Sequence, residues 1–364
     1  MWREDGSSWC AGPPPIERGV IATRPAESKL GNARPVAARR RPWHIIAAMP
    51  RVSYVVTIYN KVPVLPFLVA GLAAQQGDFA REFIFVDDGS SDGSAALLRA
   101  LTQGWDHVTI LSQANAGPAP ALNAGLARAT GDFIKPVDGD DLLLPWATRR
   151  LIAAIEATGC DVAFGPQEAR YDPGEDPAAI LAGWRHEPQP IERVDDALRR
   201  SLHRAQTNPS AWLARTAAVR RSGGCDERVF IQDYSIELRL AAQGGFARLR
   251  EPVFLMPAAA PGRLSDNQAQ ILHDMNLALA HFLAERPDLP RDLARLGFTR
   301  AAVRAWAWAR RRGHRGVASR EFLLACGARL GILRPTAANL HATCRAFAAT
   351  HPVRVPPGGG KGVC

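Results

Sequence analysis

The fold is decided by residues 133–141, which read FIKPVDGDD. Apolar residues lead directly into three carboxylates around one glycine, and this pattern predicts a buried strand that ends in an acidic turn. Carboxylates this close together raise each other's pKa unless a cation lies among them. Gly139 allows a sharp turn, so Asp138 and Asp140 can face one point. Oxygen ligands of this kind suit Mg²⁺ or Mn²⁺, and a solvated turn at a strand end is the alternative.

Lys135 lies inside this predicted strand, three residues before the first acid. Its position favours a strand residue whose ammonium group snorkels to the surface over a ligand of a diphosphate.

Strands and helices alternate before the acidic turn. The sequence predicts strands over 52–58, 83–86 and 107–111, and helices over 64–76, 94–101 and 118–129. An alternation of about 25–30 residues is typical of βαβ units and therefore of a parallel sheet. In such a sheet, ligands bind beyond the carboxyl ends of the strands.

Polar side chains follow the ends of these predicted strands, and we expect them to lie at one edge of the sheet. They are Tyr59, Asn60, Asp87, Asp88, Asn115, Asp138 and Asp140. A carboxylate can accept from the imide N–H of uracil, so Asp87 or Asp88 could read a base without a glycine loop. Neither G-x-G-x-x-G nor a P-loop is present. An EF-hand over 88–99 fails because its twelfth position is Arg99 rather than Glu.

Five short motifs in this half resemble those of family 2 glycosyltransferases with the GT-A fold. They are VTIYN (56–60), FVDDGSSDGS (85–94), NAGP (115–118), LNAGL (122–126) and DGDD (138–141). The resemblance is firm over residues 52–144 and extends more loosely to about residue 255. It implies a Rossmann-like α/β sandwich around a central, mostly parallel sheet.

The resemblance also implies a chemistry: inverting transfer from a UDP-, GDP- or dTDP-sugar with a divalent metal, Mn²⁺ or Mg²⁺. In the family pattern, Asp138 approaches the ribose or the metal and Asp140 holds the metal. Arg263, in the GRLS segment 262–265, would close over the diphosphate, and a surface loop is the alternative there. The remaining donor-binding residues implied are Thr57, Tyr59, Asn60, Asp87, Asp88 and Asn115.

The second half contains the candidate catalytic base, Asp233. We expect helices over 146–158 and 215–221, and a further helix that begins just after Asp233 and continues to Ala242. We also expect strands over 162–164 and 208–214, and a loop over the cleft at 172–190. An N-cap is the ordinary structural explanation for Asp233, because a helix N-terminus holds a carboxylate ionised. The resemblance, through GGCDE at 223–227, makes it the base. Gln232 replaces the acid that commonly precedes this base, which puts the acceptor preference in doubt.

Charge is unevenly distributed over the chain. Residues 1–50 hold 8 basic and 4 acidic residues, residues 51–280 hold 22 and 27, and residues 281–364 hold 15 and 4. An acidic body argues against nucleic acid as a partner, and a basic C-terminal region suits an anionic lipid surface. The 6 cysteines form no C-x-x-C pair, which predicts a reducing cytoplasm.

Beyond residue 257 the sequence predicts a basic helical appendage, with helices over 267–284, 291–312 and 320–330. The stretch VRAWAWARRR (303–312) suits a helix that contacts an anionic membrane over residues 300–315. A packed helix with a solvated basic end is the alternative. His273 could be a third metal ligand, but a lone histidine on an apolar helix is more commonly packed.

These observations predict the following organisation. Residues 1–49 are a disordered basic segment, with translation starting at Met49 as one hypothesis. Residues 50–257 are a GT-A domain with a nucleotide-sugar half (50–145) and an acceptor half (146–257). Residues 258–355 are the helical region, and 356–364 a disordered tail.

The predicted function is sugar transfer to a hydroxyl group of a glycan or glycolipid, of the cell-envelope or exopolysaccharide type. The enzyme would be cytoplasmic or peripheral at the inner face of the membrane. The alternatives are a nucleotidyltransferase on a related sheet, which would need a basic loop after the first strand where only Lys61 stands, and a non-catalytic glycan- or lipid-binding module.

Overall fold

The computed structural model describes residues 49–258, 266–313 and 319–354. The expectations for residues 1–48, for Arg263 and for the tail 356–364 lie outside the described residues. The described residues from Met49 onward group into one compact unit. Within the described part of the chain, no helix is both long enough and apolar enough to cross a bilayer.

The first half alternates strands and helices as the sequence predicts. Its elements are β1 (Arg51–Ile58), α1 (Leu65–Ala73), β2 (Ala80–Asp87), α2 (Ser94–Leu101), β3 (Val108–Ser112), α3 (Pro118–Arg128) and β4 (Phe133–Asp138). β4 ends at the first acid of the turn, as predicted.

The second half is less regular. Its elements are β5 (Leu142–Leu143), α4 (Ala147–Thr158), β6 (Val162–Phe164), β7 (Gln167–Tyr171), α5 (Pro177–Gly183), β8 (Glu192–Val194), α6 (Ala197–His203), the 3₁₀ turn η1 (Pro209–Ala211), β9 (Trp212–Arg215), α7 (Thr216–Ser222), α8 (Asp233–Ala241), β10 (Phe246–Arg248) and β11 (Phe254–Pro257). The loop expected over 172–190 contains helix α5. Asp176 caps this helix by accepting from the backbone N–H of Ala179 at 3.1 Å.

Eight strands form the central sheet in the order β3-β2-β1-β4-β9-β6-β10-β8. β1 pairs in parallel with β2 and β4, and β2 pairs in parallel with β3. β9 is antiparallel to both of its neighbours, β4 and β6. A second sheet of three strands has the order β5-β11-β7. The expected mostly parallel sheet is therefore confirmed, with β9 reversed near its centre and β8 reversed at its edge.

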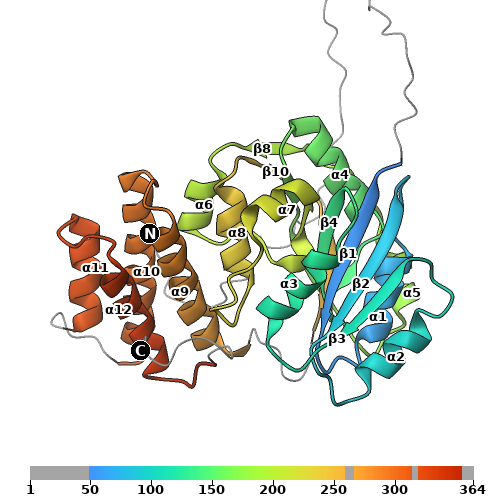
Figure 1. The fold of residues 1–364 in the computed structure, drawn as a ribbon, viewed down its shortest axis with the longest axis horizontal. Coiled ribbons are helices and arrows are strands. Elements are labelled where there is room, and N and C mark those ends of the chain that lie inside the picture. Colours follow the sequence, from blue (N-terminus) through green and yellow to red (C-terminus); the bar gives the residue numbers. More distant parts are fainter. Residues whose placement is uncertain (1–48, 259–265, 314–318, 355–364) are drawn as a thin grey trace, which may run out of the picture. The chain divides into compact units, whose positions relative to one another are not determined.

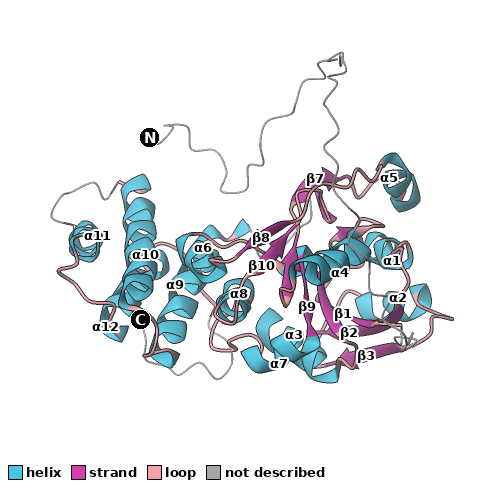
Figure 2. Cartoon of the chain, turned by 90° about the horizontal axis from the view of Figure 1, so that it is seen from above, coloured by secondary structure: helices cyan, strands magenta, loops and turns pink. Residues whose placement is uncertain are grey.

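Both faces of the central sheet are covered, which explains why its strands are apolar almost throughout. In β1, Tyr54 and Val56 pack with α1, α2 and α4, whereas Val55 packs with α3, α7 and α8 on the opposite face. This alternation follows the two-residue period of a strand. Figure 2 shows α1, α2 and α4 on one side of the strands and α3 and α7 on the other.

The C-terminal region contains four helices in the described residues: α9 (Gln268–Glu285), α10 (Arg291–Arg311), α11 (Arg320–Leu330) and α12 (Ala337–Ala348). The sequence analysis did not predict α12. Leu279 of α9 and Phe298 of α10 share a buried cluster with Leu202 of α6 and Leu238 of α8. The helical region thus packs on the second half of the α/β domain, beside α6 and α8 (Figure 1).

The tryptophans of α10 belong to this packing. Trp308 is 1% exposed and packs against Phe347 of α12, and Trp306 packs edge-on against Phe322 of α11. Trp308 is therefore unavailable for the membrane contact expected for residues 300–315, whereas Trp306 remains partly exposed.

Candidate active site

The acidic turn after β4 is held close to the end of β1. Thr57 and Asp138 are register partners in the parallel pair. A Cβ atom on Gly139 would lie 2.6 Å from the carbonyl oxygen of Thr57, so only glycine fits there. The turn closes through a hydrogen bond of 3.1 Å from the N–H of Asp141 to the carbonyl oxygen of Asp138. Close backbone approach therefore fixes where the carboxylates project.

The carboxylates of the turn form a repulsive cluster. Burial raises the pKa of Asp138 well above its ordinary value, and the negative charges of Asp141, Asp233 and Asp140 raise it further. Lys61 opposes this rise in pKa. Its Nζ lies 2.5 Å from Oδ2 of Asp140. Lys61 follows β1, so the chain supplies a cation to the turn from the neighbouring strand end.

A second lysine lies beneath the turn. Lys135 is fully buried and donates to the carbonyl oxygens of Pro136 at 3.0 Å and Ser210 at 2.6 Å. Burial lowers its pKa to about 7, while Asp141 and Asp138 oppose the shift. The expected snorkelling is wrong, because β4 is central in the sheet and covered on both faces. Ser210 also accepts from the N–H of Asp138 through Oγ at 2.9 Å.

Asp87 and Asp88 lie at the end of β2 and have different surroundings. Asp88 accepts from the side chain of Gln113 at 2.8 Å and from the N–H groups of Ala116 and Gly117, each at 2.9 Å. Through these bonds, both carboxylate oxygens of Asp88 hold the NAGP segment in place. Asp87 accepts from Ser90 N–H at 3.2 Å. Asp87 is therefore the better placed of the two acids to contact a ligand.

The other candidate donor-binding residues surround these acids. Thr57 is half-buried at the end of β1, and Tyr59 is 44% exposed. Asn60 adopts a left-handed φ of 53°, a conformation that asparagine tolerates. It accepts from Ser91 N–H at 2.9 Å. Exposed Asn115 follows β3, beside Gly89. The predicted polar residues thus gather at the carboxyl ends of β1, β2, β3 and β4.

Asp233 approaches this edge from the second half of the domain. It is the first residue of α8, and the N-cap position is occupied by Gln232 without a side-chain cap bond. The structural alternative of an Asp233 cap is therefore wrong. Burial, followed by the charge of Glu237 one turn later, raises the pKa of Asp233 to about 7. A backbone hydrogen bond opposes this rise in the pKa of Asp233 without cancelling it.

Glu237 was not identified from the sequence, although its i,i+4 spacing from Asp233 was visible. It is buried and accepts from the N–H groups of Gln206 and Thr207, at 2.9 Å each. The segment 206–210 is consequently held at one end by α8 and at the other by Lys135. A short stretch of backbone thus connects the helix that carries Asp233 with the acidic turn.

The GGCDE segment (223–227), which precedes α8, is fixed by contacts with α3 and α8. Gly224 has a φ of 75°, and a Cβ atom there would lie 2.5 Å from Oδ1 of Asn123. Oδ1 of Asn123 accepts from Cys225 N–H at 2.8 Å. The N–H of Asp226 donates to Ser235 Oγ at 3.0 Å, which fixes the loop to the first turns of α8. Asn123, from the LNAGL motif, thereby links the two halves.

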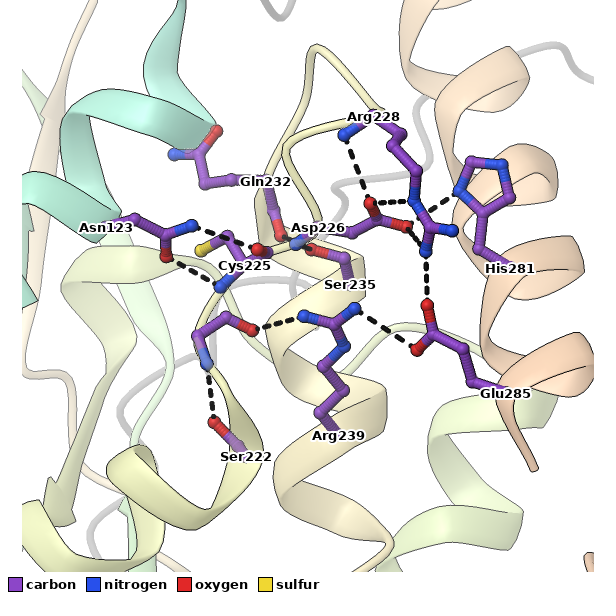
Figure 3. A network of polar contacts seen from close by, with 11 residues as sticks. Asn123, Ser222, Cys225, Asp226, Arg228, Gln232, Ser235, Arg239, His281 and Glu285 are labelled. Carbon is purple, nitrogen blue, oxygen red and sulfur yellow. Dashed lines mark hydrogen bonds and ion pairs between the residues drawn. The ribbon is translucent and has the colours of Figure 1, made fainter. Parts of the chain in front are cut away.

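A charged network extends from this loop to α9, and Figure 3 shows the carboxylate of Asp226 between Arg228 and His281. Arg228 Nε lies 2.7 Å from Asp226 Oδ1, and His281 Nδ1 lies 2.7 Å from Oδ2. Burial alone would raise the pKa of Asp226, but its bonds with His281 and Arg228 hold that pKa well below the usual range. Glu285 of α9 joins Arg228 to Arg239 of α8.

The residues present suit a metal that is shared with a substrate. Among the described side chains, no group of three His, Cys, Asp or Glu residues could hold an ion by itself. Mg²⁺ and Mn²⁺ are commonly held by one or two carboxylates together with substrate phosphates and waters. Asp138 and Asp140 offer such a pair, with carboxylate repulsion that a cation would relieve. His273 is buried, 2.8 Å from Asp274, so its side chain packs within the helical region, as the alternative reading had it.

The sequence profile described as "Glycosyl transferase family 2" matches residues 53–208. The chain carries a family 2 glycosyltransferase domain. This match covers the edge of the sheet with the acidic turn and ends before Asp233. The family predicted from the motifs is confirmed.

Curated relatives of this glycosyltransferase domain match over short stretches. The succinoglycan biosynthesis protein ExoO of Rhizobium meliloti (strain 1021) is 34% identical over 118 residues, 32% of this chain and 33% of the relative. The undecaprenyl-phosphate 4-deoxy-4-formamido-L-arabinose transferase of Sodalis glossinidius is 36% identical over 126 residues, 34% of this chain and 38% of the relative. The chain therefore spans only about a third of the length of these relatives.

Solved glycosyltransferases share the architecture over most of the chain. S. aureus TarS 1–349 in complex with UDP-GlcNAc has a TM-score of 0.58 at 17% identity and covers 85% of this chain and 95% of that one. The mannosyltransferase PcManGT of Pyrobaculum calidifontis, in complex with GDP-Man and Mn²⁺, has a TM-score of 0.52 at 20% identity and covers 85% and 90%. At these identities the likeness establishes the GT-A fold alone.

Proposed function

We propose that this glycosyltransferase is an inverting enzyme that transfers a sugar from a nucleoside diphosphate to a hydroxyl group of a glycan or lipid-linked acceptor. One observation carries the proposal: Asp138 and Asp233 come from different halves of the domain, yet the charge of Asp233 raises the pKa of Asp138. The pKa of Asp233 itself is about 7. A general base works best with a pKa near the operating pH, so Asp233 suits proton abstraction.

The donor would lie along the carboxyl ends of β1, β2 and β4. Asp87 would accept from the base, and Thr57 and Tyr59 would line the nucleoside pocket. Asn60 and Asn115 would shape the rim of this pocket, and Asp138 would approach the ribose or the metal. In support, the two solved relatives are named as complexes with UDP-GlcNAc and GDP-Man. Arg263, outside the described residues, would contact the diphosphate.

Asp140, with Asp138, would hold a divalent metal, Mn²⁺ or Mg²⁺. Such an ion neutralises the negative charge that develops on the departing nucleoside diphosphate. Mn²⁺ is named in the complex of the mannosyltransferase from P. calidifontis. Lys61 and Lys135 would hold the acidic turn in place when no donor is bound.

The residues of the chain then perform a single displacement. The carboxylate of Asp233 accepts the proton of the acceptor hydroxyl group. The acceptor oxygen forms a bond to the anomeric carbon while the bond from that carbon to the diphosphate oxygen breaks. The nucleoside diphosphate leaves with the bonding electrons. The configuration inverts because the acceptor oxygen attacks the face of the anomeric carbon opposite the leaving group. No second carboxylate is needed as a nucleophile.

The acceptor class is proposed from the relatives. One is named for succinoglycan biosynthesis and another for transfer to undecaprenyl phosphate. We propose an acceptor of the cell-envelope or exopolysaccharide type, reached from the cytoplasm at the inner face of the membrane. The described cysteines are free and mostly buried, which agrees with a reducing compartment.

Donor binding can be tested by thermal shift with UDP, GDP and dTDP, each with and without Mn²⁺. We expect one nucleotide to raise the melting temperature, and Mn²⁺ to increase that rise. The matching nucleotide sugars are then screened for release of nucleoside diphosphate. Stabilisation without any release would favour a non-catalytic binding module. Pyrophosphate release from a nucleoside triphosphate would favour a nucleotidyltransferase.

A further inference from the structure

Large apolar side chains gather in the open at the C-terminal end of α11. Leu323 is 58% exposed, Leu330 69% and Ile332 73%. These are three of the five large hydrophobic residues that are exposed in the described part of the chain. We call them the α11 apolar patch. Their concentration within ten residues distinguishes them from the scattered surface leucines of ordinary proteins.

Local geometry explains why these side chains lie outside the core. α11 ends at Gly331, whose φ of 76° is left-handed and turns the chain back. Leu333 then donates its N–H to the carbonyl oxygen of Gly327 at 3.0 Å and packs over that glycine. Leu333 therefore takes the inner position, and Leu330 and Ile332 remain at the surface.

The patch borders a hollow between α11 and α12, with a volume of about 500 Å³. Leu323, Leu330 and Ile332 all line this hollow, so the three side chains share one surface. Arg320, one turn before Leu323, lines it as well.

The charge around the patch has one sign. Arg320, Arg329 and Arg334 are exposed. Glu321 is the one acidic residue between residue 320 and the end of the chain. Apolar side chains beside three arginines, with a single acid to compensate, are suited to the interface of an anionic bilayer.

We propose that the α11 apolar patch docks the protein on an anionic lipid membrane. The leucines and the isoleucine enter the boundary between head groups and acyl chains, and the three arginines contact lipid phosphates. The inference rests on the proposed function and deepens it, because a lipid-linked acceptor gives the enzyme a reason to be at a membrane. It moves the lipid contact from α10 to α11 and the turn that follows.

A second copy of the chain fits this surface less well. A two-fold contact would bring the arginines of one copy against those of the other, with only Glu321 to compensate. Three side chains are also few for a stable dimer, which buries roughly 800 Å² on each partner.

The test is flotation of the full chain with vesicles of phosphatidylcholine, with or without phosphatidylglycerol. We expect binding to the mixed vesicles, weakened by salt. The variant L323S/L330S/I332S should bind at least about tenfold more weakly. R329Q/R334Q should bind about 25-fold more weakly, since each basic residue at the surface contributes about fivefold. R99Q/R128Q removes the same charge from exposed sites on α2 and α3 and should retain most of the binding.

Three results would overturn the proposal. They are absence of wild-type binding to the mixed vesicles, equal binding by L323S/L330S/I332S, and a dimer in light scattering that this variant converts to a monomer without any vesicle binding. Circular dichroism would establish that the variant is folded. Release of nucleoside diphosphate from the donor is measured on the same samples. It should be unchanged in the patch variants, and its absence in the wild type would count against the proposed function and not against docking.

Discussion

Nζ of Lys61 lies 2.5 Å from Oδ2 of Asp140, which joins the end of β1 to the acidic turn after β4. The two side chains are 20% and 14% exposed, so the pair is partly shielded from water. The carboxylate that the family pattern assigns to the metal therefore has a cation of the chain's own. A divalent ion must share this oxygen with the ammonium group or displace it.

Substitution of Lys61 should strengthen metal binding. In K61M, Asp140 loses its internal partner, and we expect Mn²⁺ without donor to bind about fivefold to tenfold more tightly, equivalent to roughly 1 kcal/mol. Titration followed by electron paramagnetic resonance of free Mn²⁺ measures this directly. K61R keeps the charge and is the matched control. Equal affinity in K61M and the wild type would mean that the ion pair does not compete with the metal.

Substitutions should distinguish the metal-binding role proposed for Asp140 from the proton-accepting role proposed for Asp233. D140A should lose both turnover and the Mn²⁺-dependent part of nucleotide binding. D233N should bind nucleotide and metal normally and lose transfer by about 10²–10⁴-fold, the usual contribution of a general base. Calorimetry with nucleotide and Mn²⁺, beside single-turnover transfer, measures both. Equal loss of nucleotide binding in D233N would contradict its assignment as the base.

Transfer should depend on pH through Asp233, whose pKa is about 7. Below that value the carboxylate is protonated and cannot accept a proton. We therefore expect kcat/KM to fall tenfold per pH unit as the pH decreases below about 7. The raised pKa also means that the folded state binds a proton between about pH 4 and pH 7 that the unfolded state does not, so Asp233 makes the fold less stable as pH rises through this window. D233N should remove that dependence of stability, which urea titrations at several pH values would detect.

The network at Asp226 should contribute to stability. D226N removes a buried negative charge that contacts Arg228 and His281, and we expect a loss of about 1–3 kcal/mol in the free energy of unfolding at pH 7. The pKa of Asp226 is depressed, so its contribution is present above about pH 4 and is lost as pH falls through the folded-state pKa. D288N removes an acid of an exposed ion pair with Arg286 and is the control, with no measurable change expected. A loss equal in both variants would contradict the role of the network.

The donor side of the site could be predicted from the sequence because it depends on local patterns. Buried strands of β-branched and aromatic residues end in polar tips, and parallel pairing places these tips at one edge. β4 ends at Asp138 as the stretch 133–141 predicts. The helix α5 within 172–190 was missed because a capped helix of 7 residues is hard to separate from a polar loop in sequence. The helix α12 was missed as well.

The electrostatics could not be predicted because they depend on contacts between distant residues. Lys61 reaches Asp140 across 79 positions of sequence, and Lys135 reaches Ser210 across 75. The burial that raises the pKa of Asp233 comes from the packing of α8 in the folded domain. Sequence indicates that acids and lysines are present, and only the fold decides which of them meet.

The segment 206–210 fixes the separation between the start of α8, at Asp233, and the acidic turn after β4. The backbone N–H of Gln206, its first residue, donates to Glu237 of α8. The carbonyl oxygen of Ser210, its last residue, accepts from Lys135 of β4. The reversed strand β9 follows directly, so the backbone of this segment is held at both ends. In the proposed mechanism, the length of this stretch of main chain would set the distance between the proton acceptor and the leaving diphosphate.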